Sequence, residues 1–276
     1  MSQEHRFQRG FGMLVILKRD DEESSRQAAQ LIASAVRKKP TLTLGLATGV
    51  TMLGVYKHLV RLHKEGSLDF SRVVTFNLDE YLGLSPSHPE SFHHFMRENF
   101  FAHVNMASQN IHIPDGTIRG NYDQYCAGYE EAIRKAGGID VQLLGIGRNG
   151  HIGFNEPTSS IGSRTRLKVL SQETLDDNSK SFAPGDQSPR CAITMGIGTI
   201  LEARKILLLA TGTAKAAAVA KSIEGPITSA VSASALQLHP EVTFIIDDAA
   251  ASELTQRDYY HRVLEMTALL TPERLS

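Results

Sequence analysis

"TLTLGLATGVTMLGVYKHLVRLHKEG" (residues 41–66) contains the pattern that decides the fold class of this chain. Its apolar run over 41–47 is typical of a buried strand. The segment 51–66 has the amphipathic pattern of a helix and ends in a glycine suited to a helix C-cap. A buried strand that is followed at once by a helix is the repeating unit of parallel α/β sheets.

The same alternation continues along the chain. Further apolar runs that predict strands lie at residues 13–17, 72–76, 140–147, 205–210 and 241–246, and further helical patterns lie at 22–39 and 214–225. We therefore predict an α/β fold with a mostly parallel, open, Rossmann-like sheet that has helices on both faces. No repeat or linker interrupts the pattern, so one domain is expected over 13–276, after a polar tail at 1–12. The segment 174–190 is rich in Ser, Asp, Gly and Pro and is expected to be the least ordered, with a lid as one role.

Composition limits the classes of partner and compartment. Hydrophobic residues at 41% and charged residues at 21% are ordinary for a soluble globular protein, and a net charge of −1 gives no general attraction to nucleic acid or to a membrane surface. The two cysteines, Cys126 and Cys191, show no metal or disulfide pattern and fit a reducing compartment. No stretch has the length of a signal peptide core or a membrane span, so we expect a cytoplasmic protein.

The loop after the strand at 41–47 is a candidate phosphate site. Ligands of open parallel sheets gather beyond the carboxyl ends of the strands. Here Thr48, Gly49 and Thr51 stand directly before a helix, where backbone N–H groups bind anions and a glycine permits close approach. The spacing is neither that of a P-loop nor that of a dinucleotide fingerprint. A threonine N-cap after a glycine turn is the alternative interpretation.

Two adjacent acids follow the strand at 72–76. Asp79 and Glu80 point in different directions, so at most one is expected to face the crevice and to shuttle protons, while both could instead be turn or capping residues. The nearby His88, His93 and His94 lack the spacing of a helical zinc site. We expect them on a solvated helical face and expect no metal site.

The loop after the strand at 140–147 carries the strongest signal. Glycines bracket Asn149, His151 and Glu156 in "LLGIGRNGHIGFNEP", and they allow sharp turns and close contact with a ligand. A histidine oriented by polar neighbours titrates near neutral pH and can move protons. A purely structural imidazole is the alternative.

Together, "LGLATGVT", "FNLDEYLGL", "HPESF" and "LLGIGRNGHIGFNEPTSSIGSRTRLKVL" resemble the glucosamine-6-phosphate deaminase (isomerising) family. The resemblance continues through "ATGTAKAAAVAKSIEG" and "SALQLHP" and covers roughly residues 13–250. Related 6-phosphogluconolactonases do not normally continue into Phe-Asn-Glu-Pro. The resemblance implies conversion of glucosamine 6-phosphate and water to fructose 6-phosphate and ammonia, without a metal or a cofactor.

The resemblance also implies the roles of the proton-transfer residues. His151 matches the ring-opening residue, with Asn149 and Glu156 orienting it, and Asp79 matches the general base that moves a proton from C2 to C1. Many family members have aspartate where this chain has Asn149, and an amide cannot stabilise an imidazolium by charge. We therefore expect Glu156 to be the anionic partner of His151.

For the substrate phosphate, the resemblance implies an amide cradle in the loop 48–51 and a cationic ligand at Lys215. A further family contact, commonly an arginine, falls near Lys180 here. Lysine offers a point charge in place of the bidentate fork of arginine.

A second phosphate site regulates some hexameric family members, which bind N-acetylglucosamine 6-phosphate between subunits. Ser159, Arg166 and Lys168 match that site, with a solvated strand face as the alternative for the two cations. A homo-oligomer is thus possible. The 12-residue extension before Met13 displaces the terminal amine of the family's usual start, so we expect a weak or absent response to the effector.

Two other functions share these features. A 6-phosphogluconolactonase-like hydrolase would keep the phosphate loop and the histidine, but it needs no base at C2, so Asp79 argues against it. A non-catalytic sugar-phosphate sensor would lose the proton-transfer groups, which this chain retains. The sequence before the phosphate loop also has no basic cluster or helix-turn-helix pattern for DNA binding.

Overall fold

Strands and helices alternate along the chain in the computed structural model, which describes residues 12–179, 182–183, 188–272 and 275. The strands are β1 (Leu14–Lys18), β2 (Thr43–Leu46), β3 (Val74–Asn77), β4 (Asp79–Tyr81), β5 (Ile111–His112), β6 (Val141–Leu144), β7 (Arg166–Val169), β8 (Cys191–Thr194), β9 (Lys205–Ala210) and β10 (Val242–Asp247). The helices are α1 (Asp21–Lys38), α2 (Val50–Lys64), α3 (Phe92–Asn99), α4 (Tyr122–Lys135), α5 (Gln172–Ser179), α6 (Ile197–Leu201), α7 (Ala216–Ile223) and α8 (Arg257–Leu270), with the short 3-10 helix η4 (Thr213–Lys215) before α7.

A parallel sheet with the strand order β1-β10-β9-β6-β2-β3-β5 forms the centre of the molecule. Its strand pairs are parallel throughout. All six strands predicted from apolar runs are present in it, and the predicted fold class is confirmed. The two-residue strand β5 was not predicted, because it contains no apolar run.

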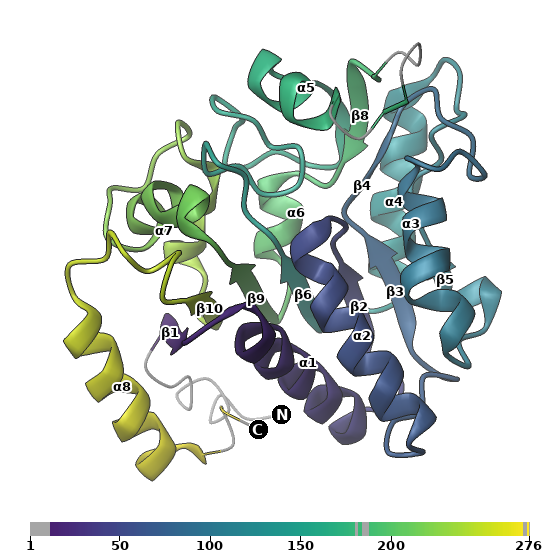
Figure 1. Ribbon diagram of the computed structural model, residues 1–276. Coiled ribbons are helices and arrows are strands. Elements are labelled where there is room, and N and C mark those ends of the chain that lie inside the picture. Colours follow the sequence, from purple (N-terminus) through teal and green to yellow (C-terminus); the bar gives the residue numbers. More distant parts are fainter. Residues whose placement is uncertain (1–11, 180–181, 184–187, 273–274, 276) are drawn as a thin grey trace, which may run out of the picture.

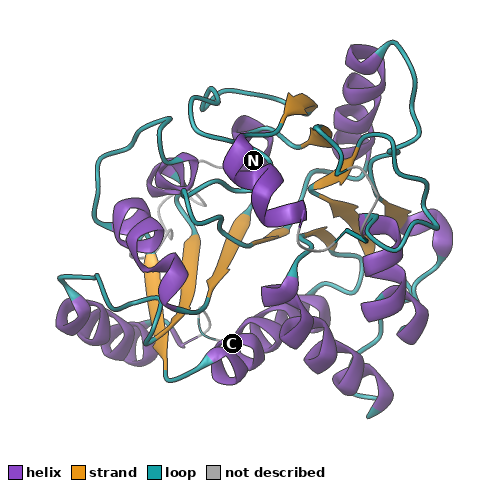
Figure 2. Cartoon of the chain, turned by 45° about the horizontal axis from the view of Figure 1, so that its top comes forward, coloured by secondary structure: helices purple, strands orange, loops and turns teal. Residues whose placement is uncertain are grey.

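Helices cover both faces of this sheet (Figure 1). The chain crosses the sheet from β1 through β2 to β3 in one direction and returns from β6 through β9 to β10 in the other. Because crossovers between parallel strands are right-handed, the helices of the two runs lie on opposite faces. In Figure 1, α1 and α2 lie together in front of the sheet, and α4 and α6 lie behind it. Figure 2 turns the loops beyond the carboxyl edge of the strands toward the viewer.

A second, antiparallel sheet with the order β4-β8-β7 was not predicted. Its strands are short and of mixed polarity, so none of them stands out in the sequence as an apolar run. In particular, Asp79 and Glu80 lie on β4, where the sequence predicts only a loop. This small sheet places Asp79 beside the parallel sheet.

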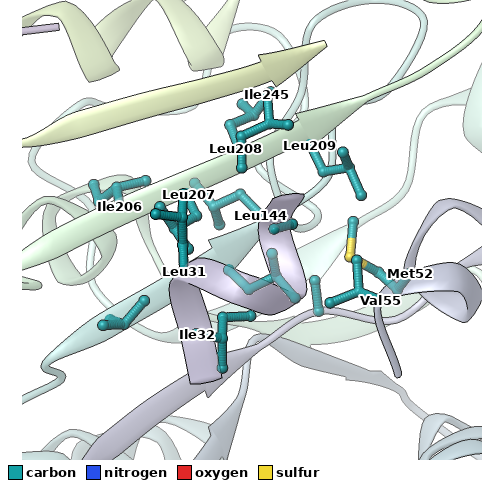
Figure 3. Close-up of a cluster of buried hydrophobic side chains, with 14 of the residues drawn as sticks. Leu31, Ile32, Met52, Val55, Leu144, Ile206, Leu207, Leu208, Leu209 and Ile245 are labelled. Carbon is teal, nitrogen blue, oxygen red and sulfur yellow. The ribbon is translucent and has the colours of Figure 1, made fainter. Parts of the chain in front are cut away.

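The main core lies between the parallel sheet and its helices (Figure 3). The side chains labelled there come from α1, α2, β6, β9 and β10, and each is at most 4% exposed: Leu31, Ile32, Met52, Val55, Leu144, Ile206, Leu207, Leu208, Leu209 and Ile245. Burial of one such side chain contributes about 1.5–3 kcal/mol. The strands are apolar on both faces because both faces are covered, which is why they were visible in the sequence.

Two predicted segments fall partly outside the described residues. Of the predicted tail 1–12, only residue 12 is described. In the segment 174–190, which is expected to be the least ordered, the residues up to Ser179 belong to α5, while 180–181 and 184–187 lie outside the described residues. The lid, and the single domain over 13–276, stay predictions.

Candidate active site

A cavity of about 600 Å³ opens at the carboxyl edge of the parallel sheet, where β2 and β6 lie side by side. The chain leaves β2 toward β3 and leaves β6 toward β9, on opposite sides of this pair. Such a reversal leaves a crevice between the two outgoing loops, which is the usual ligand position of open α/β sheets. The cavity is lined by the loops after β2, β3 and β6, by the start of α3, by α5 and by Lys215.

The loop after β2 presents the start of α2 to this cavity. The N-cap of α2 is Gly49, with φ +120° and ψ 165°, a backbone conformation that favours glycine. Within the described chain, no side chain caps this helix end, so the N–H groups of its first turn can bind an anion. Thr48 and Thr51 line the cavity beside it. The alternative of a threonine N-cap is wrong, because Gly49 occupies that position.

Lys215 lines the same cavity from the end of η4. The turn before it is held by Asp247, whose two carboxylate oxygens accept the backbone N–H of Gly212 at 3.1 and 3.0 Å. Burial lowers the pKa of Lys215, and the charge of Asp177 opposes that shift. The structure thus brings Lys215 and the loop 48–51 to one cavity, while Lys180, the other predicted phosphate ligand, lies outside the described residues.

Asn149 fixes the tautomer of His151. Asn149 Oδ1 accepts the backbone N–H of His151 at 3.1 Å and lies 2.7 Å from the ring Nδ1. Because a backbone N–H only donates, the atom that it meets is the amide oxygen, and Nδ1 must carry a proton to bond to the same oxygen. In the neutral ring, Nε2 is then left as an acceptor. A Cβ at Gly147 would lie 2.3 to 2.5 Å from three ring atoms, so a glycine is required there.

Glu156 supports this pair from the interior, where it is 4% exposed. Its Oε2 accepts from Asn149 Nδ2 at 3.3 Å and lies 3.6 Å from His151 Nδ1, and its Oε1 accepts the backbone N–H of Ser171 at 3.1 Å. Burial raises the pKa of Glu156, but hydrogen bonds from Thr174 and Ser171 and the nearby imidazole hold it below its ordinary value. Burial lowers the pKa of His151, although the Glu156 charge opposes this. The arrangement is a neutral imidazole next to a buried carboxylate.

Asp79 lines the cavity from β4 and is 6% exposed. Its strand neighbour on β8 is Thr194. A Cβ at Gly153 would lie 3.3 Å from Asp79 Oδ2, so the missing side chain of Gly153 lets the loop of His151 approach the carboxyl group. Burial, together with the charge of Glu80, raises the pKa of Asp79 to about 8. A carboxyl group with such a pKa is suited to act as a base near neutral pH.

Glu80 points away from the cavity, which agrees with the expectation that only one of the two acids would face it. Its carboxylate accepts the backbone N–H groups of Phe92 and His93 at 3.0 Å each, and it lies 2.9 Å from His93 Nδ1. Glu80 therefore fastens the start of α3 to β4. The expectation of a solvated histidine face is wrong at His93, because this ring pairs with a buried carboxylate.

The residues predicted to hold a second phosphate do not line this cavity. Arg166 and Lys168 alternate on β7, so their side chains share one face of the antiparallel sheet. Arg166 Nη1 donates to Asn155 Oδ1 at 3.0 Å, and both cations are half-buried, which contradicts a fully solvated strand face. Ser159 is 3% exposed, and its hydroxyl has no hydrogen-bond partner among the described residues.

Arg148 and the acids of α5 were missed by the sequence reasoning. Arg148 donates from Nε and Nη2 to the two carboxylate oxygens of Asp177, at 3.0 and 2.9 Å, and all of Arg148, Glu173 and Asp177 line the cavity. Arg148 lies inside the glycine motif that carries His151, and this position in the motif is the feature of the sequence that could have identified it as a cavity residue. Aromatic side chains in mutual contact form another part of the wall: Tyr81, Phe92, Phe154 and Phe182.

Comparison with known proteins gives the family of this chain. Residues 20–244 match the family model described as glucosamine-6-phosphate isomerases/6-phosphogluconolactonase. A relative from Thermoanaerobacter pseudethanolicus, named glucosamine-6-phosphate deaminase, is 51% identical over 246 residues, which are 89% of this chain and 97% of the relative. A relative of the same name from Hahella chejuensis is 50% identical over 255 residues, or 92% of this chain and 97% of the relative. The chain belongs to the glucosamine-6-phosphate deaminase family.

The solved structures agree with this membership in the deaminase family. One described as a monomeric glucosamine-6-phosphate deaminase has a TM-score of 0.85 and 45% identity, and the match covers 87% of this chain and 100% of that one. A 6-phosphogluconolactonase from Trypanosoma brucei has a TM-score of 0.68 at 20% identity, with 89% of this chain and 100% of that one covered. That second likeness shows the fold alone. The resemblance of the sequence motifs to the deaminase family is confirmed.

Two further features concern this deaminase family member. Among the helices that the structure describes, none is both long and apolar enough to cross a membrane. Within the same described residues, no three His, Cys, Asp or Glu side chains are grouped so that they could hold a metal ion.

Proposed function

We propose that this protein converts glucosamine 6-phosphate and water into fructose 6-phosphate and ammonia, a step of amino-sugar catabolism. The observation that carries the proposal is that the Asp79 carboxyl group, the His151 imidazole and the start of α2 line one cavity. Relatives named for this activity are about half identical to the chain over about nine tenths of its length.

The phosphate of the substrate would bind at the start of α2. The N–H groups of the first helical turn and the partial positive charge of the helix end favour an anion there. The hydroxyls of Thr48 and Thr51 add donors, and Lys215 adds a full positive charge. Lys180 is proposed as a further cationic contact.

Ring opening would depend on His151. The closed pyranose has no carbonyl group, so a proton must move from the anomeric hydroxyl to the ring oxygen. Nε2 of His151 takes the proton from the anomeric hydroxyl and delivers it to the ring oxygen, while Asn149 holds the Nδ1 proton in place. The imidazolium that forms in between is stabilised by the negative charge of Glu156.

The isomerisation would depend on Asp79. Its carboxylate removes the proton from C2 of the open-chain aldehyde, and the C–H electrons form the C1–C2 double bond while the C1 oxygen takes a proton from the ammonium group on C2. Asp79 then returns its proton to C1, which leaves an imine at C2. Water adds to C2 and ammonia leaves, which completes fructose 6-phosphate. The aldehyde of the substrate supplies the acidity at C2 that this route needs.

Ammonia release from glucosamine 6-phosphate by the purified protein tests the proposal. The parent protein is expected to release ammonia, and Asp79→Asn is expected to lose that activity. Hydrolysis of 6-phosphogluconolactone is the matched assay for the related hydrolase, which has no need of a base at C2. No ammonia from the parent protein overturns the deaminase assignment. Equal release by the parent and by Asp79→Asn overturns only the role of Asp79.

We also propose Ser159, Arg166 and Lys168 as a second phosphate site with little effect on catalysis. The rate should then follow a hyperbolic curve with or without N-acetylglucosamine 6-phosphate. Sigmoidal kinetics that the effector abolishes would contradict this. Light scattering on the same sample distinguishes a monomer from the homo-oligomer that the sequence resemblance allows.

We propose the cytoplasm as the site of action. Cys126 and Cys191 are free thiols, which suits a reducing compartment. Fractionation of cells that express a tagged chain is the direct measurement.

A further inference from the structure

Four of the charged side chains that line the cavity form one cluster: Arg148, Glu173, Asp177 and Lys215. The guanidinium of Arg148 makes a two-pronged contact with Asp177, with Nε–Oδ2 at 3.0 Å and Nη2–Oδ1 at 2.9 Å, and lies 4.0 Å from Glu173 Oε1. The two acids are four residues apart on α5 and therefore share one face of the helix. The Arg148 side chain is 47% exposed and that of Asp177 is 36% exposed, so the pair lies at the mouth of the cavity.

Arg148 and Lys215 belong to the same cluster although they come from different loops. Lys215 interacts electrostatically with Asp177, Arg148 and Glu173, and the interaction with Asp177 is the largest of the three. The two cations repel each other, and the two acids on α5 compensate that repulsion. The cavity thus holds a second cation near the predicted phosphate ligand Lys215, and that cation is already bound through its fork to a carboxylate.

We propose that Arg148 is a further cationic ligand of the substrate phosphate, and that Asp177 holds its guanidinium until the phosphate displaces the carboxylate. This inference rests on the proposed deaminase function. The fork that binds two oxygens of Asp177 binds two oxygens of a phosphate in the same way, and the phosphate carries more negative charge. Exposed ion pairs of this kind are weak, so the exchange from carboxylate to phosphate is favourable.

If the phosphate replaces Asp177 as the partner of Arg148, substitutions of Arg148 and of Asp177 should change KM in opposite directions. Arg148→Gln should raise the KM for glucosamine 6-phosphate about tenfold, because the two charge-assisted hydrogen bonds to the phosphate are lost and this loss is partly offset by the ion pair with Asp177 that no longer has to be broken. Asp177→Asn should lower KM about threefold, because the competitor for the guanidinium is weakened. In the Arg148→Gln background, the benefit of Asp177→Asn should be smaller, since only its effect through Lys215 then remains. Arg134→Gln is the matched control, since it breaks an exposed pair with Glu131 on α4, at 2.7 Å, and should leave KM unchanged.

A binding measurement without substrate gives the second readout. Inorganic phosphate should raise the Tm of the parent protein and of the Arg134 control, raise it further in Asp177→Asn, and raise it little in Arg148→Gln. If the parent releases no ammonia, the proposed function fails, and the Tm series alone then decides the role of Arg148. Three results overturn the inference: equal phosphate response in the parent and Arg148→Gln, an increase of KM in both single variants, or an undiminished Asp177→Asn benefit in the double variant.

Discussion

Replacing Asp79 by asparagine is expected to abolish ammonia release and, at the same time, to stabilise the fold. Asp79 is 6% exposed, and burial together with Glu80 raises its pKa from an ordinary 3.8 to about 8. In the unfolded chain the carboxyl group ionises freely near pH 4. In the folded protein it must keep its proton until the pH is much higher, so folding opposes its ionisation.

The size of the effect follows from this difference. A carboxyl group whose pKa is raised on folding has no effect on stability below its unfolded pKa, destabilises the fold increasingly as the pH rises to its folded pKa, and has a constant effect above it. About three pH units separate the ordinary pKa of 3.8 from pH 7, and each unit lowers the free energy of unfolding by about 1.4 kcal/mol. Asp79 therefore lowers the free energy of unfolding at pH 7 by about 4 kcal/mol. Asparagine removes this penalty but buries an amide with unpaired donors, at about 1–3 kcal/mol. The net gain at pH 7 should be about 1–3 kcal/mol.

Urea unfolding of the parent and of Asp79→Asn at pH 5, 6, 7 and 8 measures this gain. The advantage of the variant should be near zero at pH 5 and should grow by about 1.4 kcal/mol for each pH unit up to pH 8. Asp123→Asn, at an exposed position in the first turn of α4, is the control and should show no such trend. A difference between the parent and Asp79→Asn that stays flat from pH 5 to 8 would refute the raised pKa, and so would a variant that is less stable than the parent at pH 8.

Three other predictions concern proton transfer. The kcat/KM of the parent should rise with pH through a midpoint near 8, because Asp79 must lose its proton, and Glu80→Gln should move this rise to lower pH by removing a neighbouring negative charge. A rise at the same pH in both proteins would argue against the Glu80 contribution. Glu156→Gln should lower kcat on the closed sugar about tenfold or more, since the imidazolium loses its counter-charge; equal turnover with the parent would remove Glu156 from ring opening. Asn149→Asp should raise the pKa of His151 in an NMR titration, because a carboxylate replaces the amide oxygen 2.7 Å from Nδ1, and an unchanged or lower pKa would contradict the contact.

The sequence predicts the parallel sheet well because each of its long strands is a continuous apolar run. A strand that is covered by helices on both faces is apolar over most of its length, and the sequences of β9 and β10 have this pattern. β4, β7 and β8 are short and carry polar residues: β7 is partly exposed, whereas the polar residues Asp79, Glu80 and Thr194 of β4 and β8 are buried. Their pairing joins segments that are far apart in the sequence, such as Asp79 and Thr194, and no local pattern reports such a contact.

The candidate site divides in the same way. Asn149, His151 and Glu156 occupy one loop, so their proximity could be inferred from sequence spacing, and the contacts among them are present. The bond between Arg148 and Asp177 spans 29 residues and exists only because α5 folds back over the cavity. The support of the Lys215 turn by Asp247 is equally remote from any motif, since it depends on β9 and β10 being neighbours in the sheet.

The position of Asp79 joins these observations. The proposed reaction needs two proton-transfer groups, and the chain supplies them from different sheets: His151 from the loop after β6 and Asp79 from β4. The two sheets meet where the backbone N–H of Met195 donates to Leu78 O at 2.7 Å, next to Asp79 in the chain. Gly153 allows the loop of His151 to lie close to Asp79, since a side chain at this position would press on the Asp79 carboxyl group. The same close packing that brings the base to the cavity also excludes water from it and raises its pKa, so the stability lost at Asp79 and its strength as a base have one physical cause.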